Sequence, residues 1–155
     1  MNLQDEPQLG FQVEAITTDR LVELHNRVVN SVSIYTSYGK AGYEDFVQYM
    51  REAILVVRFP FGLATARHGE YSHIVDAHIV IWNKEVFASG GMIFAAACQV
   101  MELTGATRVE TKFPSHIRAL HGILRKEGFV EEGKLRKYMK VGTERFDVSV
   151  YSIVR

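Results

Sequence analysis

The chain has 155 residues, the usual length of one domain and enough to bury a hydrophobic core. Its 18 basic and 18 acidic residues cancel, so no overall charge attracts nucleic acid or an anionic membrane, and neither partner is expected. Because it has one cysteine, no signal-peptide segment and no apolar run long enough to cross a bilayer, the sequence favours a single cytoplasmic domain over residues 1–155.

The first part of the chain predicts a strand, two helices and two further strands. Residues 1–10 are polar and are expected to form a loose lead-in, and residues 11–16 alternate between apolar and polar as a strand does. Apolar residues one turn apart then predict two helices, the second of which contains Phe46, Met50 and Ile54. Residues 54–59 and 61–67 are predicted strands.

Residues 73–129 carry the pattern around which the rest of the chain is organised. Residues 73–82 alternate as a strand with one apolar face, whereas the other face carries Asp76 and His78. A turn of small residues follows, and after it comes an apolar helix that Gly105 is expected to end. The small residues of the turn are Ala88, Ser89, Gly90 and Gly91, and Ser89 is the expected N-cap of the helix.

This turn is the first candidate for a ligand site. A helix start presents backbone N–H groups that lack partners, and the helix dipole adds a partial positive charge there. Small residues let those N–H groups approach an anion closely. The alternative is that the two glycines serve only the turn itself.

The remaining segments complete a layered fold. A strand is predicted at 107–113, a short helix at 115–127 with Ser115 as its cap, and further strands within 129–142 and 146–154. This order of elements, without an internal repeat, predicts one α/β (α+β) domain. Its central sheet is expected to be mixed and largely antiparallel, with about four flanking helices and at least one β-α-β crossover.

Two further segments leave alternatives open. Residues 34–43 are rich in Tyr, Ser and Gly, and they form either a surface loop or a substrate-side loop that contributes Tyr35 or Tyr38. A basic cluster near the C-terminus is either a solvated strand face or a surface for an acidic substrate or a cofactor's phosphates. Its members are Lys134, Arg136, Lys137 and Lys140.

The C-terminal segments follow the pattern of a known family. A helix ending in a Gly-Phe pair precedes an acidic, glycine-containing turn, a basic strand and a closing strand that begins with Asp and contains Tyr. The residues are Gly128, Phe129, Glu131, Glu132, Gly133, Leu135, Arg136, Asp147 and Tyr151. Over the second half of the chain this arrangement resembles the GNAT superfamily of acyl-CoA N-acyltransferases. It is similar in particular to divergent acyltransferase-like proteins of tailed bacteriophages.

The resemblance implies acetyl-CoA as the cofactor. The family's pyrophosphate loop, Arg/Gln-x-x-Gly-x-Gly/Ala, falls on residues 85–90 when it is placed by the length of the helix that Gly105 ends. Glu85 stands where the family has Arg or Gln, and its negative charge weakens phosphate binding unless the side chain points away. The backbone N–H groups expected to hold the cofactor are those of Ala88, Ser89, Gly90 and Gly91.

The resemblance also implies where catalysis would occur. The family often uses a tyrosine to protonate the departing thiolate, but Leu124 occupies that position and has no proton to donate. The expected base is therefore Asp76 or His78, near the point where an amine approaches the thioester. For His78 the alternative is a half-buried strand histidine bonded to Asp76 or to the backbone. A backbone amide near Ile81 is expected to stabilise the oxyanion.

Two functions of different classes follow. In the first, the protein is an enzyme that transfers an acetyl group from acetyl-CoA to a primary amine on a small molecule or protein. In the second, the fold has lost catalysis and serves as a structural or interaction protein that binds protein partners in a phage virion. Depending on the function, the protein is expected in the host cytoplasm or in the virion. No metal site is expected, because the six histidines are scattered.

Overall fold

The computed structural model describes residues 10–14, 17, 19, 22–23, 26, 51–141 and 143–155. Seven strands in this part of the chain form one sheet in the order β1-β2-β3-β4-β5-β7-β6. Neighbouring strands are antiparallel except β4 and β5, which are parallel. The mixed, largely antiparallel sheet predicted from the order of elements is therefore confirmed.

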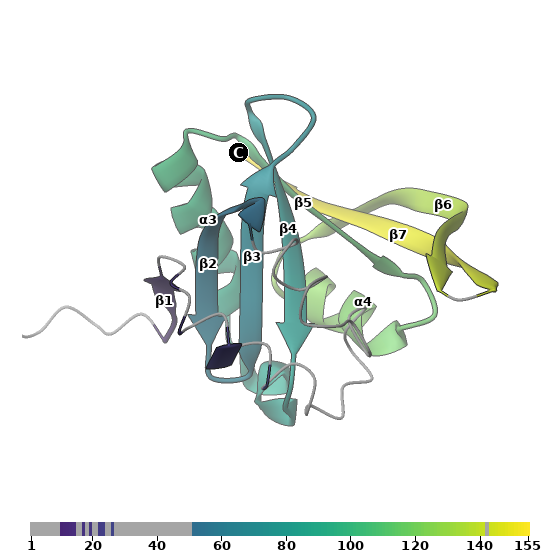
Figure 1. Ribbon diagram of the computed structural model, residues 1–155, viewed down its shortest axis with the longest axis horizontal. Coiled ribbons are helices and arrows are strands. Elements are labelled where there is room, and N and C mark those ends of the chain that lie inside the picture. The colour runs from purple at the N-terminus through teal and green to yellow at the C-terminus, as the bar shows by residue number, and fades with distance from the viewer. Residues whose placement is uncertain are drawn as a thin grey trace, which may run out of the picture.

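Figure 1 shows the strands side by side, with the β6–β7 hairpin extending away from β1. The strands are β1 (Gln12–Glu14), β2 (Ala53–Phe59), β3 (Gly62–His68), β4 (Ile74–Ile81), β5 (Arg108–Pro114), β6 (Val130–Val141) and β7 (Glu144–Val154). The helices are the 3-10 helix η1 (Lys84–Ala88) and the α-helices α3 (Met92–Thr104) and α4 (Arg118–Lys126).

The helices expected between the first two strands lie mostly outside the described residues, and Tyr35 and Tyr38 lie outside them too. The few described residues between 19 and 26 are helical. The prediction that Ile54 belongs to a helix is wrong, because Ile54 lies on β2, whose sequence is rich in β-branched residues and pairs with β3. Two α-helices, α3 and α4, lie wholly within the described residues, against about four expected for the whole chain. None of the described helices is long and apolar enough to span a bilayer.

Helix α3 makes the crossover between the parallel strands β4 and β5. Its side chains are apolar nearly all round, so it buries a broad face against the sheet. The buried residues of this face are Ile93, Ala96, Ala97, Val100 and Met101. Gly105, at a φ of 72°, ends the helix in the left-handed conformation, as predicted.

The two parallel strands separate after half their length. They pair from Ile74 and Arg108 to Ala77 and Thr111, and beyond that point no pairing joins them. Leu120 and Leu124 of α4 lie at the separation, with Phe113 of β5. The separation leaves the last half of β4 free of its neighbour on one side.

Helix α4 and the turn before it are tied to β7 by partly buried polar contacts. The Nδ1 of His121 lies 2.7 Å from the Tyr151 hydroxyl, and its Nε2 lies 2.9 Å from the Ser115 carbonyl oxygen. The prediction of Ser115 as N-cap is wrong, because α4 begins after Ile117 without a side-chain cap. The Ser115 hydroxyl lies instead 2.7 Å from that of Ser149 on β7, so a tertiary contact replaces the local one.

The β6–β7 hairpin is irregular in its middle. The register shifts between Leu135 and Met139, and Lys137 has a φ of 50°. The N–H of Lys137 donates to Oδ1 of Asp147 at 2.9 Å, which holds this bulge in place. β6 is an edge strand of the sheet, and its basic side chains are solvent-exposed: Lys134, Arg136, Lys137 and Lys140.

Replacing Leu124 with alanine should destabilise the protein strongly. The side chain is 1% exposed, and removing it leaves a cavity where α4 meets the separated strands, at a cost of about 2–5 kcal/mol. Leu103→Ala is the matched control, because this leucine is 58% exposed and its loss should change the free energy of unfolding by less than about 0.5 kcal/mol. Urea denaturation measures both. Equal effects would contradict the packing described for α4.

Candidate functional site

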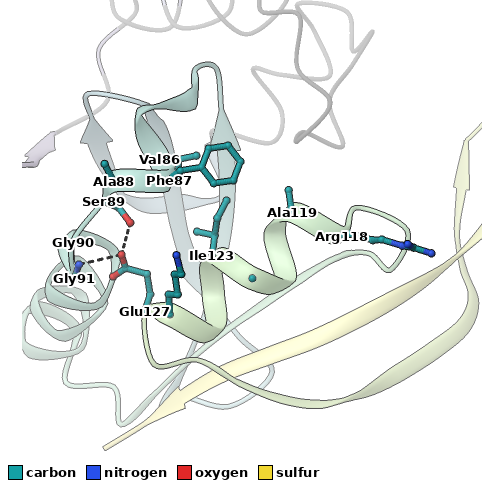
Figure 2. Close-up of a pocket in the computed structure, with 12 residues that line it drawn as sticks. Val86, Phe87, Ala88, Ser89, Gly90, Gly91, Arg118, Ala119, Ile123 and Glu127 are labelled. Atoms are coloured by element: carbon teal, nitrogen blue, oxygen red, sulfur yellow. Dashed lines mark hydrogen bonds between the residues drawn. The ribbon is translucent and has the colours of Figure 1, made fainter.

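A cavity of about 700 Å³ lies between the turn that precedes α3 and one face of α4. From the turn side it is lined by Val86, Phe87, Ala88, Ser89, Gly90 and Gly91. From the helix side it is lined by Arg118, Ala119, Gly122, Ile123, Lys126 and Glu127. Figure 2 shows the two walls facing each other.

Glycine shapes both walls. Gly90 and Gly91 have φ values of 58° and 88°, which other residues adopt only with strain. On the opposite wall, a Cβ added to Gly122 would meet no atom within 4 Å. A glycine in the middle of a helix costs about 1 kcal/mol relative to alanine, and here it leaves the α4 wall open for a ligand.

The helix after the turn begins later than predicted. Its N-cap is Gly91 rather than Ser89, and α3 begins at Met92. Residues 84–88 form the 3-10 helix η1. At its end, the backbone N–H of Ser89 donates a hydrogen bond of 3.1 Å to the carbonyl oxygen of Val86. Ser89 is therefore the C-cap of η1, because the extra helical turn moves the start of α3 to the glycines.

A carboxylate already occupies the start of α3. Glu127, at the end of α4, accepts hydrogen bonds from the N–H of Gly91 at 3.1 Å and of Phe94 at 2.9 Å. The Ser89 hydroxyl donates to the same carboxylate, as Figure 2 shows. Glu127 is only 4% exposed, so the predicted anion site binds an anion supplied by the chain itself.

Besides Glu127, one acidic and two basic side chains lie at or near the cavity. Glu85, whose charge was expected to oppose phosphate binding, is exposed and is not among the lining residues. Arg118 and Lys126 contribute positive charge to the lining, although the Arg118 side chain points away from the turn in Figure 2. For the N–H of Gly90, the described residues provide no hydrogen-bond acceptor.

A second, smaller site lies where β4 and β5 separate. It is a gap of about 10 Å³ with a mostly apolar lining, which includes His78 and Lys112. Burial lowers the pKa of His78 to about 4, and the positive charge of Arg67 lowers it further. His78 is therefore neutral at physiological pH.

Asp76 lies two residues before His78, on the same side of β4. In the sheet register it stands between Arg67 on β3 and Glu110 on β5. Burial raises the pKa of Asp76; Lys112 opposes this effect and Glu110 adds to it. Asp76 thus lies in a row of charged side chains, and the protonated form of its carboxyl is favoured more than in water.

The structure divides the predicted site residues into two groups. Those of the turn, from Ala88 to Gly91, line the large cavity, whereas His78 lines the gap between the strands. Asp76 and Ile81 line neither of them, and the side chain of Ile81 is 1% exposed. No cluster of three His, Cys, Asp or Glu that could hold a metal is found among the described residues.

Glu127 and Gly122 were missed by sequence reasoning, although both carry a local signal. An acidic residue at the C-terminal end of a helix opposes the helix dipole, so Glu127 needs a partner elsewhere. A glycine inside an amphipathic helix is also unfavourable unless something approaches it closely. Neither signal predicts what the fold places opposite: the start of α3 for Glu127, and open cavity space for Gly122.

No protein-family model matches the chain, and no curated protein matches it by sequence. Its structure is similar to that of a GNAT-family acetyltransferase from Bacillus anthracis, with a TM-score of 0.70, 16% identity and coverage of 94% of this chain and 95% of that one. A spermidine N-acetyltransferase chimera from Vibrio cholerae and hSSAT gives a TM-score of 0.71, 16% identity and the same two coverages. A probable acetyltransferase from Staphylococcus epidermidis gives 0.75, 11% identity, 93% of this chain and 98% of that one. At these identities, the likeness establishes the shared fold.

The lowered pKa of His78 should be visible in solution. An unfolded histidine has a pKa near 6.5, against about 4 in the folded protein. Between these values the unfolded state binds more protons, so the free energy of unfolding should fall as the pH drops from about 6.5 towards 4. NMR titration of the imidazole gives the pKa, and the His78→Gln variant should show a weaker pH dependence. A folded-state pKa near 6.5 would refute the burial argument.

Proposed function

We propose that this protein is an N-acetyltransferase that transfers an acetyl group from acetyl-CoA to a primary amine on a small molecule or protein. One observation carries the proposal. On the fold shared with GNAT acetyltransferases, β4 leads from the gap between the separated strands directly into the glycine turn of the large cavity. The two sites thus lie at successive points of one continuous segment, as a long cofactor with a reactive end requires.

The large cavity fits the phosphate-bearing part of acetyl-CoA. Its volume of about 700 Å³ is within the usual range for small-molecule sites. Gly122 leaves the wall of α4 open, and the N–H of Gly90 is available to a phosphate oxygen. Lys126 and Arg118 add positive charge. When bound, acetyl-CoA supplies an acetyl group activated as a thioester.

We place the acetyl end at the gap between β4 and β5, which has room for about one water molecule, so the strands must separate further to admit an acetyl group. The lining of the gap includes Ile79, Phe113 and Leu124, so bulk water is excluded and electrostatic effects on a reacting carbonyl are strengthened. The backbone near Ile81 is the proposed donor to the carbonyl oxygen.

Asp76 is the better candidate for the general base. A base works best when its pKa lies near the working pH, and burial moves the pKa of Asp76 upward in that direction. Burial lowers the pKa of His78 to about 4, which is further from the working pH than the pKa of a free histidine. We therefore assign to Asp76 the removal of a proton from the amine, and to neutral His78 a hydrogen-bonding role beside it.

Calorimetric titration with acetyl-CoA tests the cofactor site. We expect binding in the micromolar range, and we expect Gly122→Trp to weaken it at least tenfold, because the indole would fill the cavity on its open side. Gly133→Trp is the matched control, since Gly133 is also open to added atoms but lies on β6, outside the cavity lining. No binding to the wild-type protein would sink the proposal.

Replacing Asp76 tests the chemistry separately from binding. Once an acceptor amine is found by screening, Asp76→Asn should lower kcat by about 10²–10⁴-fold while the Kd of acetyl-CoA stays unchanged, because Asp76 does not line the cavity. His78→Gln should lower kcat less. A variant with wild-type kcat across the pH range would remove Asp76 from the mechanism.

A further inference from the structure

The Glu127 carboxylate lies where a phosphate of acetyl-CoA would gain most from the start of α3. It accepts hydrogen bonds from the N–H groups of Gly91 and Phe94 and from the hydroxyl of Ser89. Those donors, together with the helix dipole, are what an anion at a helix start uses. A phosphate and this carboxylate cannot occupy them together.

Within the part of the chain that the structure describes, no cation forms an ion pair with Glu127. Its side chain is almost entirely buried. A buried charge held only by dipoles repels a second anion more strongly than a solvated charge does. An incoming phosphate would therefore meet both occupied donors and an opposing charge.

We infer that Glu127 is an internal competitor for phosphate, and that it sets how tightly the cavity binds a nucleotide cofactor. This inference rests on the proposed function. Tight binding requires the carboxylate to leave the N–H groups of Gly91 and Phe94, so part of the binding free energy is used to displace it. The chain binds acetyl-CoA more weakly than a chain without this acid, and it favours ligands that reach the cavity without a phosphate at that point.

The experiment compares the wild type, Glu127→Gln and Glu102→Gln by calorimetric titration. Glutamine keeps an oxygen to accept the N–H groups but loses the charge, so Glu127→Gln should bind acetyl-CoA and dephospho-CoA at least about tenfold more tightly. Pantetheine, which has no pyrophosphate, should bind all three proteins equally. Glu102→Gln removes the same charge from an exposed side chain of α3 outside the cavity lining and should leave every affinity unchanged.

The outcomes separate this inference from the proposed function. If the wild type binds acetyl-CoA and Glu127→Gln binds it no more tightly, Glu127 is only a structural link between α3 and α4, and the inference falls alone. If neither protein binds acetyl-CoA although both melt cooperatively, both proposals fall.

A second variant covers the case in which Glu127→Gln does not fold. Ser89→Ala removes one of the three donors and keeps the charge, so the carboxylate is held less firmly. Acetyl-CoA should then bind this variant several-fold more tightly than the wild type. Unchanged or weaker binding to it would equally overturn the inference.

Discussion

The parallel pairing of β4 and β5 over only half their length is the constraint on which the rest of the structure depends. Parallel neighbours need a crossover, and α3 supplies it, buried against the sheet because its side chains are apolar. Where the pairing stops, α4 inserts its leucines, and β4 runs on alone into the glycine turn. Both candidate sites thus arise from one departure from regular sheet geometry.

A second link joins the two helices that this arrangement brings together. Glu127 ends α4 and bonds to the start of α3, so one side chain satisfies donors on another element and fixes the separation of the cavity walls. Close packing alone does not define that distance, because the α4 wall has open space at Gly122. Cavity shape and charge therefore depend on the same carboxylate.

Regular patterns in the sequence predicted the sheet and the long helix well. Alternation identified β4, and the left-handed glycine at 105 marked the end of α3 as expected. The helix starts were wrong, because Ser89 and Ser115 bond to Glu127 and Ser149, which are distant in sequence, instead of capping their own helices. The candidate site was foreseen at the glycine turn but not at its opposite wall, since periodicity within one segment carries no information about which segment faces it.

The bulge at Lys137 bears on how the protein behaves at high concentration. An exposed edge strand offers free N–H and C=O groups, and two such edges can join into one extended sheet that seeds aggregates. On β6 the irregular backbone at Lys137 interrupts the row of N–H and C=O groups that would pair with those of a second edge strand. The exposed lysines of two approaching molecules would also repel each other. The projecting hairpin is thereby protected from self-association along its edge.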